Sequence, residues 1–318
     1  MAQETVIIKK TNIKTESKSK SKLQYLMNNK ALYIMLLPGL LLTLVFRYFP
    51  MYGILLAFKD YNPLQGVWGS PWVGFQHFET FFTSPNFGIL LNNTLRLSIF
   101  GLILGFFPPM ILALSLNQII NKKWRQRIQL ILYAPNFISV VIIVGMIFVF
   151  FSTHGPVNSV LGRFTGNTFR FMQDARFFRP LYIGSGIWQG MGWSSILYTS
   201  ALANVDTDLL DASKIDGANI FERIWHIEIP AIKPVMVINF ILAVGGVMSV
   251  SYEKAFLMQT SLNLPSSEIL STYVYKVGLQ QGNYGFSTAV GLFNSVVNII
   301  LLVSANEIIK KFNEGKGI

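Results

Sequence analysis

The chain has 318 residues, of which 52% are hydrophobic and 13% charged, and its formal net charge at pH 7 is +11. Soluble domains carry about 25% charged residues, so this composition indicates a membrane protein. The absence of cysteine excludes a disulfide framework and a thiolate metal site, and three scattered histidines argue against any metal centre, so we expect no cofactor bound by this chain. The excess of Lys and Arg fits cytoplasmic loops beside anionic lipid, and no nucleic-acid-binding motif accompanies it, so nucleic acid is not an expected partner.

The first 30 residues are polar and basic. Residues 1–30 hold seven lysines against Glu4 and Glu16. No small-residue cleavage site follows the first apolar run, so a secretory signal is not indicated. We expect residues 1–30 to form a disordered cytoplasmic arm, residues 31–312 to form the membrane domain, and residues 313–318 to be a short tail.

Apolar runs long enough to cross about 30 Å of hydrocarbon recur along the chain. These expected spans are 31–57, 93–118, 128–152, 181–204, 234–258 and 284–306. The pattern predicts an all-α, polytopic membrane protein with six transmembrane helices.

Lysine and arginine set the expected orientation. If the N-terminus is cytoplasmic, the inward-facing segments hold 17 Lys and Arg, whereas the outward-facing segments hold 6. This bias places both termini in the cytoplasm. The outward loop 153–180 disagrees, because it carries four arginines against the single acid Asp174.

One inward-facing loop is acidic where the others are basic. Residues 205–233 carry six acids against three bases. Asp206 and Asp208 favour a helix N-terminus, where carboxylates suit the free N–H groups and the helix dipole. Gly217 is expected to end this helix in the left-handed conformation, and Pro230 is expected to end a second helix before the next span.

The second short helix has its own start signal. Asn219 and Glu222 have the spacing of a capping box. Phe221, Ile224 and Trp225 fall at i, i+3 and i+4, which predicts one apolar stripe. Such a hairpin suits a groove on a soluble partner. The alternative is a helix lying on the membrane, but such helices carry Lys and Arg toward anionic lipid, so the acidic charge favours a protein partner.

The same stretch carries a recognisable spacing. It reads Asp211-Ala212-Ser213, three residues, Gly217, nine residues, Ile227, Glu228 and Ile229-Pro230. This resembles the signature of ABC importer permeases, which is Glu-Ala-Ala, three residues, Gly, nine residues, Ile, one residue, Leu-Pro. The departures are Asp in place of Glu, Ser in place of the second Ala, and Ile in place of Leu. Over about residues 30–312 the chain is similar to type I importer permeases of the carbohydrate branch. It looks like the first permease of maltose-type systems, and most like the subgroup for complex oligosaccharides and polysaccharide fragments.

The resemblance implies a fold, a function and an assembly. The fold is that of a type I ABC importer permease, and the function is to form the path of an oligosaccharide or polysaccharide fragment through the bacterial cytoplasmic membrane. The implied partners are a second permease in a hetero-dimer, two cytoplasmic ATPase subunits and an extracytoplasmic solute-binding protein. The chain would then be no enzyme, and ATP and Mg would be used by the ATPase. The absence of GxxxxGK[ST] agrees with this division.

The resemblance also assigns hairpin 205–230 to coupling with the ATPase. The residues so implied are Asp211, Ala212, Ser213, Gly217, Phe221, Ile227 and Pro230.

A sugar path through a bilayer needs aromatic rings and polar side chains that face the bundle interior. The candidates on the fourth to sixth spans are Trp188, Trp193, Tyr198, Asn239, Ser249, Tyr252, Glu253 and Asn294. For each of the aromatic, amide and hydroxyl residues the alternative is an interfacial or packing role. Glu253 lies about 30 Å along the fifth span from its start, so a place on the rim of the path and a role as interfacial anchor both stay open.

A secondary active transporter is the alternative function. Such proteins are built from inverted repeats and broken helices, with buried groups that couple to ions. The chain shows no convincing internal repeat, and its third, fourth and sixth spans carry no charged residue. These spans offer little for proton or sodium coupling, which favours the ATP-driven importer.

Overall fold

A computed structural model of the chain describes residues 30–248 and 250–312. Within these residues the regular structure is helical, with no strand and one isolated bridge between Lys59 and Trp72. The predicted all-α class is therefore confirmed.

The chain divides into two compact units, residues 1–52 and 53–318. The first described helix is α2 (Lys30–Thr43). Of the basic arm expected over 1–30, only Lys30 is described, and the expected tail 313–318 also lies outside the described residues.

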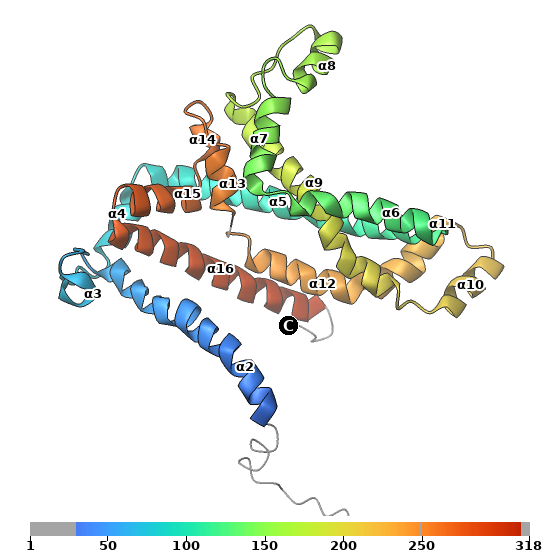
Figure 1. The fold of residues 1–318 in the computed structure, drawn as a ribbon, viewed down its shortest axis with the longest axis horizontal. Helices are drawn as coiled ribbons and strands as arrows, with labels where there is room; N and C mark the ends of the chain where they lie inside the picture. The colour runs from blue at the N-terminus through green and yellow to red at the C-terminus, as the bar shows by residue number, and fades with distance from the viewer. Residues whose placement is uncertain (1–29, 249, 313–318) are drawn as a thin grey trace, which may run out of the picture. The chain divides into compact units, whose positions relative to one another are not determined.

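Four long helices form the frame of the second unit. They are α5 (Asn86–Asn117), α9 (Ala175–Leu202), α12 (Ile229–Gly245) and α16 (Tyr284–Phe312). α5 packs along α9, and α12 packs along α16 and also contacts α9 (Figure 1).

Short helices connect this frame and cover its ends. The α-helices among them are α3 (Gly66–Gly69), α4 (Gln76–Thr83), α6 (Lys122–Tyr133), α7 (Val140–Phe150), α8 (Pro156–Thr165), α10 (Thr207–Ile215), α11 (Ile220–Arg223), α13 (Tyr252–Leu257), α14 (Leu264–Ser267) and α15 (Leu270–Tyr275). The 3₁₀ and π turns are Leu44–Tyr48, Phe49–Phe58, Ala134–Phe137, Ile224–Glu228 and Lys276–Gln280. Figure 1 shows α4 and α15 at one end of α5, and α10 and α11 beyond its other end.

Buried side chains of the second unit form three clusters. The first surrounds Leu97 and joins α5, α7, α9 and α13. The second surrounds Phe81 and joins α4, α5, α15 and α16. The third surrounds Ile232 and joins α5, α9 and α12, and Val205 and Ile224, from the two ends of the acidic hairpin, pack against it. The third cluster thus anchors the base of the hairpin to the long helices.

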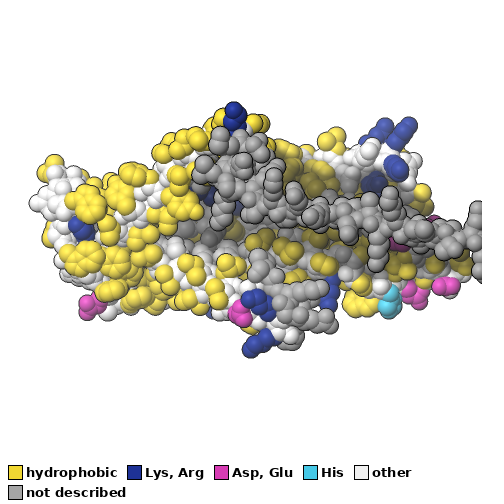
Figure 2. Space-filling model, turned by 90° about the horizontal axis from the view of Figure 1, so that it is seen from below, with side chains coloured by type: hydrophobic (Ala, Val, Ile, Leu, Met, Phe, Trp, Pro, Cys, Tyr) yellow, Lys and Arg dark blue, Asp and Glu magenta, His cyan; other side chains and the backbone are white. Residues whose placement is uncertain are grey.

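The described helices support the membrane character predicted from composition. Four helical stretches are long and apolar enough to span a membrane: Lys30–Phe58, Asn86–Asn117, Ile220–Gly245 and Tyr284–Ile308. A bent pair of helices, α6 and α7, makes a fifth if it counts as one span. α9 has 28 residues but is not among them, because Gly, Ser and Gln dilute its apolar side chains. Figure 2 shows hydrophobic side chains over much of the visible face.

The prediction of one continuous helix over 128–152 is wrong. The stretch Lys122–Phe137, which consists of α6 and the 3₁₀ turn Ala134–Phe137, meets α7 at 97°. Pro135 in this turn has no N–H to donate, and Ser139 starts α7 by accepting a hydrogen bond from the backbone N–H of Ile142. Local sequence signals therefore break this span.

The prediction of one continuous helix over 234–258 is also wrong. α12 and α13 are separated by a non-helical segment. In this segment the backbone N–H of Met248 donates to Oδ1 of Asn298 at 2.9 Å, and its carbonyl oxygen accepts from Nδ2 of Asn294 at 3.3 Å. Amides of α16 thus satisfy backbone groups that a helix would satisfy internally, which makes the break tolerable.

Candidate functional site

The acidic loop forms a helical hairpin at the end of the second unit where α5 ends (Figure 1). α10 starts directly after Asp206, whose carboxylate accepts a hydrogen bond from the backbone N–H of Asp208 at 2.9 Å. This is the predicted helix cap. Lys214 forms an exposed ion pair with Asp211 at 2.8 Å. This base neutralises only one of the hairpin's acids.

Gly217 makes the turn between α10 and α11. Its φ of +81° is the left-handed conformation that the sequence predicts. The N–H of Ala218 donates to the carbonyl oxygen of Ser213 at 2.9 Å, which satisfies a group that the end of α10 would leave free. Asn219 Oδ1 then accepts from the N–H of Glu222 at 3.0 Å, and the Glu222 carboxylate accepts from the N–H of Asn219 at 2.7 Å. The predicted capping box is confirmed.

The hairpin surface, defined by Ile215, Phe221, Trp225 and the acids around them, combines apolar and negative side chains. Ile215, Phe221 and Trp225 are 86%, 81% and 69% exposed. Ile224 instead packs on the third cluster, so the predicted stripe is divided between an outer and an inner face. The exposed acids of the hairpin are Asp206, Asp208, Asp211, Asp216 and Glu222. Figure 2 shows acidic side chains at the end where α10 and α11 lie.

The prediction that Pro230 ends the second helix is wrong. The chain stays helical from Ile220 to Gly245, with a π-helical turn over Ile224–Glu228 just before the proline. In this turn the N–H of Ile229 donates to the carbonyl oxygen five residues earlier. The wider turn makes room for a residue that has no N–H and whose ring would clash in a regular helix. The second helix of the hairpin, α11, and α12 are therefore one continuous rod.

Glu228 fixes this rod to α5. It is 2% exposed, and its carboxylate accepts hydrogen bonds from Nδ2 of Asn117 at 3.0 Å and from Nε2 of Gln118 at 2.8 Å. Sequence reasoning counted it only as one acid of the loop. The spacing of Glu228 indicates that it faces the core, because Ile224, Glu228 and Ile232 follow i, i+4 and i+8 and lie on one helix face.

We expect Glu228→Ala to loosen the hairpin from α5. Without the carboxylate, the two amide side chains lose their acceptor in a buried place, which costs about 1–3 kcal/mol. The apparent unfolding temperature of the purified protein should fall, and proteolysis within the hairpin should become faster. Glu253→Ala removes an exposed carboxylate and is the control. If both variants unfold at the temperature of the unmodified protein, the anchoring role of Glu228 is refuted.

Three of the eight predicted path residues line one space, here called the aromatic hollow. Trp193, Tyr198 and Asn239 surround about 630 Å³ between α5, α9 and α12. Tyr198 of α9 and Asn239 of α12 face this space from neighbouring helices. Gly101 and Gly105 of α5 form part of the wall with bare backbone. An indole, a phenol and an amide facing an open space are groups that can stack on and hydrogen-bond to a sugar.

Two other path residues line a second hollow. Tyr252 and Asn294 belong to a space of about 390 Å³, and Tyr252 stacks on Tyr275 with ring centroids 5.2 Å apart. Asn294 also donates to the carbonyl of Met248 in the helix break, so its amide has a structural partner.

Trp188 and Glu253 do not line either hollow. Trp188 lies among apolar side chains of α7 and α9. Glu253 is exposed, and Ser249 falls outside the described residues. Which of the eight residues contact a sugar stays a prediction.

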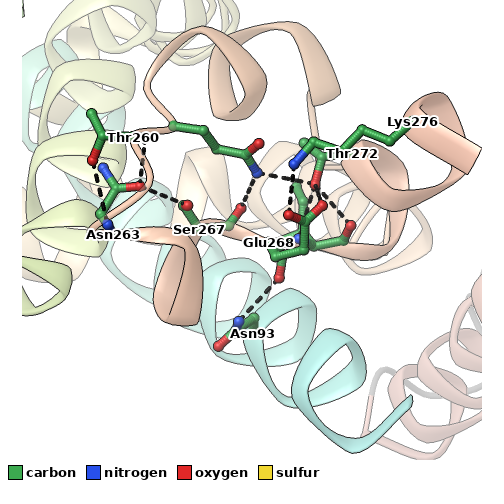
Figure 3. A network of polar contacts seen from close by, with 9 residues as sticks. Asn93, Thr260, Asn263, Ser267, Glu268, Thr272 and Lys276 are labelled. Carbon is green, nitrogen blue, oxygen red and sulfur yellow. Dashed lines mark hydrogen bonds and ion pairs between the residues drawn. The ribbon is translucent and has the colours of Figure 1, made fainter. Parts of the chain in front are cut away.

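A polar network holds the segment after α13 against α5 (Figure 3). Asn93 donates to the backbone carbonyls of Pro265 and Glu268 at 2.9 and 3.0 Å. Glu268 forms an ion pair with Lys276 at 2.7 Å. Asn263, which is 1% exposed, accepts a hydrogen bond from the backbone N–H of Thr260 and so caps the turn between these two residues. Sequence reasoning did not identify this network, because its members are far apart along the chain.

Lys254 follows Glu253 in α13 but is buried. It is 5% exposed. Its Nζ donates to the carbonyl oxygen of Tyr182 at 3.0 Å and lies 4.9 Å from the centroid of the Tyr182 ring. Neighbouring helix positions point in different directions, so Glu253 faces out while Lys254 faces α9.

Comparison with known proteins places this arrangement among transport components. Residues 109–313 match the family described as binding-protein-dependent transport system inner membrane component. The chain is 44% identical over 301 residues to Protein LplB of Bacillus subtilis (strain 168), which covers 94% of this chain and 95% of that protein. It is 42% identical over 314 residues to the polygalacturonan/rhamnogalacturonan transport system permease protein YteP of the same organism, covering 98% and 96%.

Solved structures agree with these sequence relatives. A bacterial ABC transporter involved in the import of the acidic polysaccharide alginate contains a chain that matches with a TM-score of 0.84 and 34% identity, covering 92% of this chain and 99% of that chain. The alginate transporter in complex with an alginate pentasaccharide-bound periplasmic protein matches with the same score and identity, over 93% and 99%.

Proposed function

The chain belongs to the binding-protein-dependent transport system inner membrane component family, and on that premise we propose that it forms the path of an oligosaccharide or polysaccharide fragment across the bacterial cytoplasmic membrane. It is a permease subunit of an ABC importer, in which a separate subunit hydrolyses ATP. The observation that carries the proposal is the match to the alginate importer chain over 92% of this chain at a TM-score of 0.84. The names of YteP and of that importer support a saccharide as the cargo.

Six membrane crossings with both termini cytoplasmic are part of the proposal. Four crossings lie within the stretches long and apolar enough by composition, and in Ile220–Gly245 the crossing is the α12 part, Ile229–Gly245. The bent pair α6 and α7 forms the fifth crossing. α9 forms the sixth, because it has 28 residues and packs along the apolar α5. The excess of Lys and Arg in the segments that then face inward supports this orientation.

The proposed assembly contains a second permease, two ATPase subunits and an extracytoplasmic solute-binding protein. The alginate transporter was solved with a periplasmic protein that carries the pentasaccharide, which supports the last of these partners. ATP and Mg are used by the ATPase subunits, and this chain needs no cofactor of its own.

The hairpin surface is the proposed contact with the ATPase. Large apolar side chains exposed next to acids suit a groove in a soluble partner. Of the implied coupling residues, Asp211, Ala212, Gly217, Phe221 and Pro230 are exposed, whereas Ser213 and Ile227 are partly buried. Because α11 and α12 form one rod, a displacement of the hairpin surface would move α12 and with it Asn239 in the aromatic hollow.

We expect Phe221→Asp to detach the ATPase and to stop ATP-dependent saccharide uptake. Phe221 is 81% exposed, so a charge there leaves the fold intact but replaces an apolar contact with an unpaired carboxylate in the interface. The measurements are copurification of the ATPase with this chain and uptake of saccharide by reconstituted vesicles that contain ATP.

Phe164→Asp is the matched control, because Phe164 is 85% exposed in α8, far from the hairpin (Figure 1). This variant should keep the ATPase bound. Retention of ATPase and uptake by Phe221→Asp would refute the coupling role. Uptake driven by a proton or sodium gradient without ATP would favour the alternative, a secondary transporter.

A further inference from the structure

Lys254 is a buried cation that lacks a carboxylate partner in the part of the chain that the structure describes. It is 5% exposed, and the ion pairs between described residues do not include it. An ammonium group has three N–H donors, and the described acceptor is the carbonyl oxygen of Tyr182 at 3.0 Å. Buried charges in proteins are ordinarily paired, so this site is short of one negative charge.

The ammonium group of Lys254 lies next to Gly186, which lines a groove between α5 and α9, here called the glycine groove. Tyr182 and Gly186 line this groove of about 250 Å³, and a Cβ on Gly186 would lie 3.3 Å from Nζ of Lys254. The glycine groove continues into the aromatic hollow, because both are lined by Gly101, Gly105, Pro109 and Ser194. A single elongated ligand can therefore extend from Gly186, beside the cation, to the aromatic side chains.

Two more cations lie on the same pair of helices. Arg179 stands one turn before Tyr182 on α9, donates to Oδ1 of Asn93 at 2.8 Å, and has a buried Nε without a partner. Arg96 of α5 lies close enough for its positive charge to repel that of Arg179. Among the described ion pairs none includes either arginine.

We propose that the glycine groove binds a carboxylate of an acidic saccharide, with Lys254 as its counter-charge and Trp193, Tyr198 and Asn239 against the neighbouring sugar rings. This inference rests on the proposed function and names the chemistry of the cargo. A neutral saccharide offers Lys254 hydroxyl oxygens but no negative charge, whereas a carboxylate forms the stronger, charge-assisted hydrogen bond. Lys254 is thus a specificity-determining residue of the path.

The test compares trigalacturonate with its fully methyl-esterified form, which keeps the sugar rings and removes the negative charges. Binding of each is measured by equilibrium dialysis against the importer complex, purified through this chain and placed in lipid nanodiscs. We expect the unmodified complex to bind the free acid about ten-fold more tightly than the ester. Lys254→Met should bind both forms alike, whereas Lys254→Arg should keep the preference.

Lys310→Met is the matched control, since Lys310 is exposed near the end of α16 and should not affect the preference. Basal ATP hydrolysis by each complex verifies assembly. Equal binding of the two forms by the unmodified complex, or a preference that survives in Lys254→Met, overturns the inference. If the complex binds the ester as tightly as the acid, the inference about Lys254 is contradicted, but the proposed function as a saccharide importer is not. If the complex binds neither form and no saccharide-loaded binding protein stimulates its ATP hydrolysis, the proposed function fails as well.

Discussion

Gly217→Val is expected to abolish saccharide uptake while the protein still inserts into the membrane. Gly217 has φ +81°, and no atom lies within 4 Å of the place where a Cβ would stand, so the substitution introduces strain without a clash. The left-handed conformation costs a residue with a Cβ about 1–2 kcal/mol, and valine is stiffer than alanine at this position. Relief of this strain opens the turn and moves Phe221 and Trp225 away from α10. The measurements are uptake by reconstituted vesicles and the amount of protein in the membrane fraction.

Gly166→Val is the matched control for this prediction. Gly166 ends α8 with φ +67° and also has no atom within 4 Å of a Cβ, so the backbone strain is of the same kind. Both variants should insert, and Gly217→Val alone should lose uptake. Gly217→Asn should recover part of the activity, because asparagine tolerates this conformation. Normal uptake by Gly217→Val, or an equal loss in Gly166→Val, would count against the hairpin as the coupling element.

Gly192→Ala is expected to disrupt the packing of α9 against α6. A Cβ on Gly192 would lie 2.0 Å from the carbonyl oxygen and 2.6 Å from the carbonyl carbon of Leu132. Both are backbone atoms, which cannot rotate away as a side chain does. Overpacking in a fitted core costs about 1–3 kcal/mol, and a contact this short with backbone belongs at the upper end of that range or beyond it. We expect a lower yield of folded complex and a lower apparent unfolding temperature.

Gly190→Ala separates this clash from the general effect of alanine in a helix. Gly190 lies on the same helix, and no atom lies within 4 Å of its Cβ position. Alanine favours the helical state over glycine by about 1 kcal/mol, so this variant should be as stable as the unmodified protein or slightly more so. A similar fall in unfolding temperature for both variants would show that the close approach of α6 does not decide stability.

The rod that contains α12 and the segment after the break are attached to α5 separately. Glu228 and the third cluster fix the lower part of the rod to α5, whereas the rod ends at Gly245 beside the amides of α16. The segment after the break is held to α5 by the network around Asn93. The break therefore separates the rod anchored through Glu228 from the segment anchored through Asn93.

Sequence signals that act within one turn of helix were sufficient for the hairpin. Asp206 caps α10, Gly217 adopts the left-handed conformation, and Asn219 and Glu222 bond to each other as their spacing predicts. Each of these features depends on backbone groups no more than a few residues away. The spacing of Asp211 to Pro230 also carried the resemblance to importer permeases, which the family match supports.

The long helices were less predictable, because their continuity depends on what surrounds them. A proline normally ends a helix, yet Pro230 is accommodated by a π turn within a rod that the third cluster and Glu228 hold straight. Conversely, the charge-free run before Tyr252 looks continuous but is broken, since Asn298 accepts the hydrogen bond that the helix gives up at Met248.

By itself, the amino-acid sequence determined the helical class, the membrane setting and the hairpin with its turn, because apolar runs, caps and a left-handed glycine act locally. Only the tertiary structure decided that Trp193, Tyr198 and Asn239 share one hollow and that Lys254 is buried against Tyr182, 72 positions away. Burial and pairing of a side chain are set by residues from other helices. Their positions follow from the packing of whole helices, which no local pattern encodes.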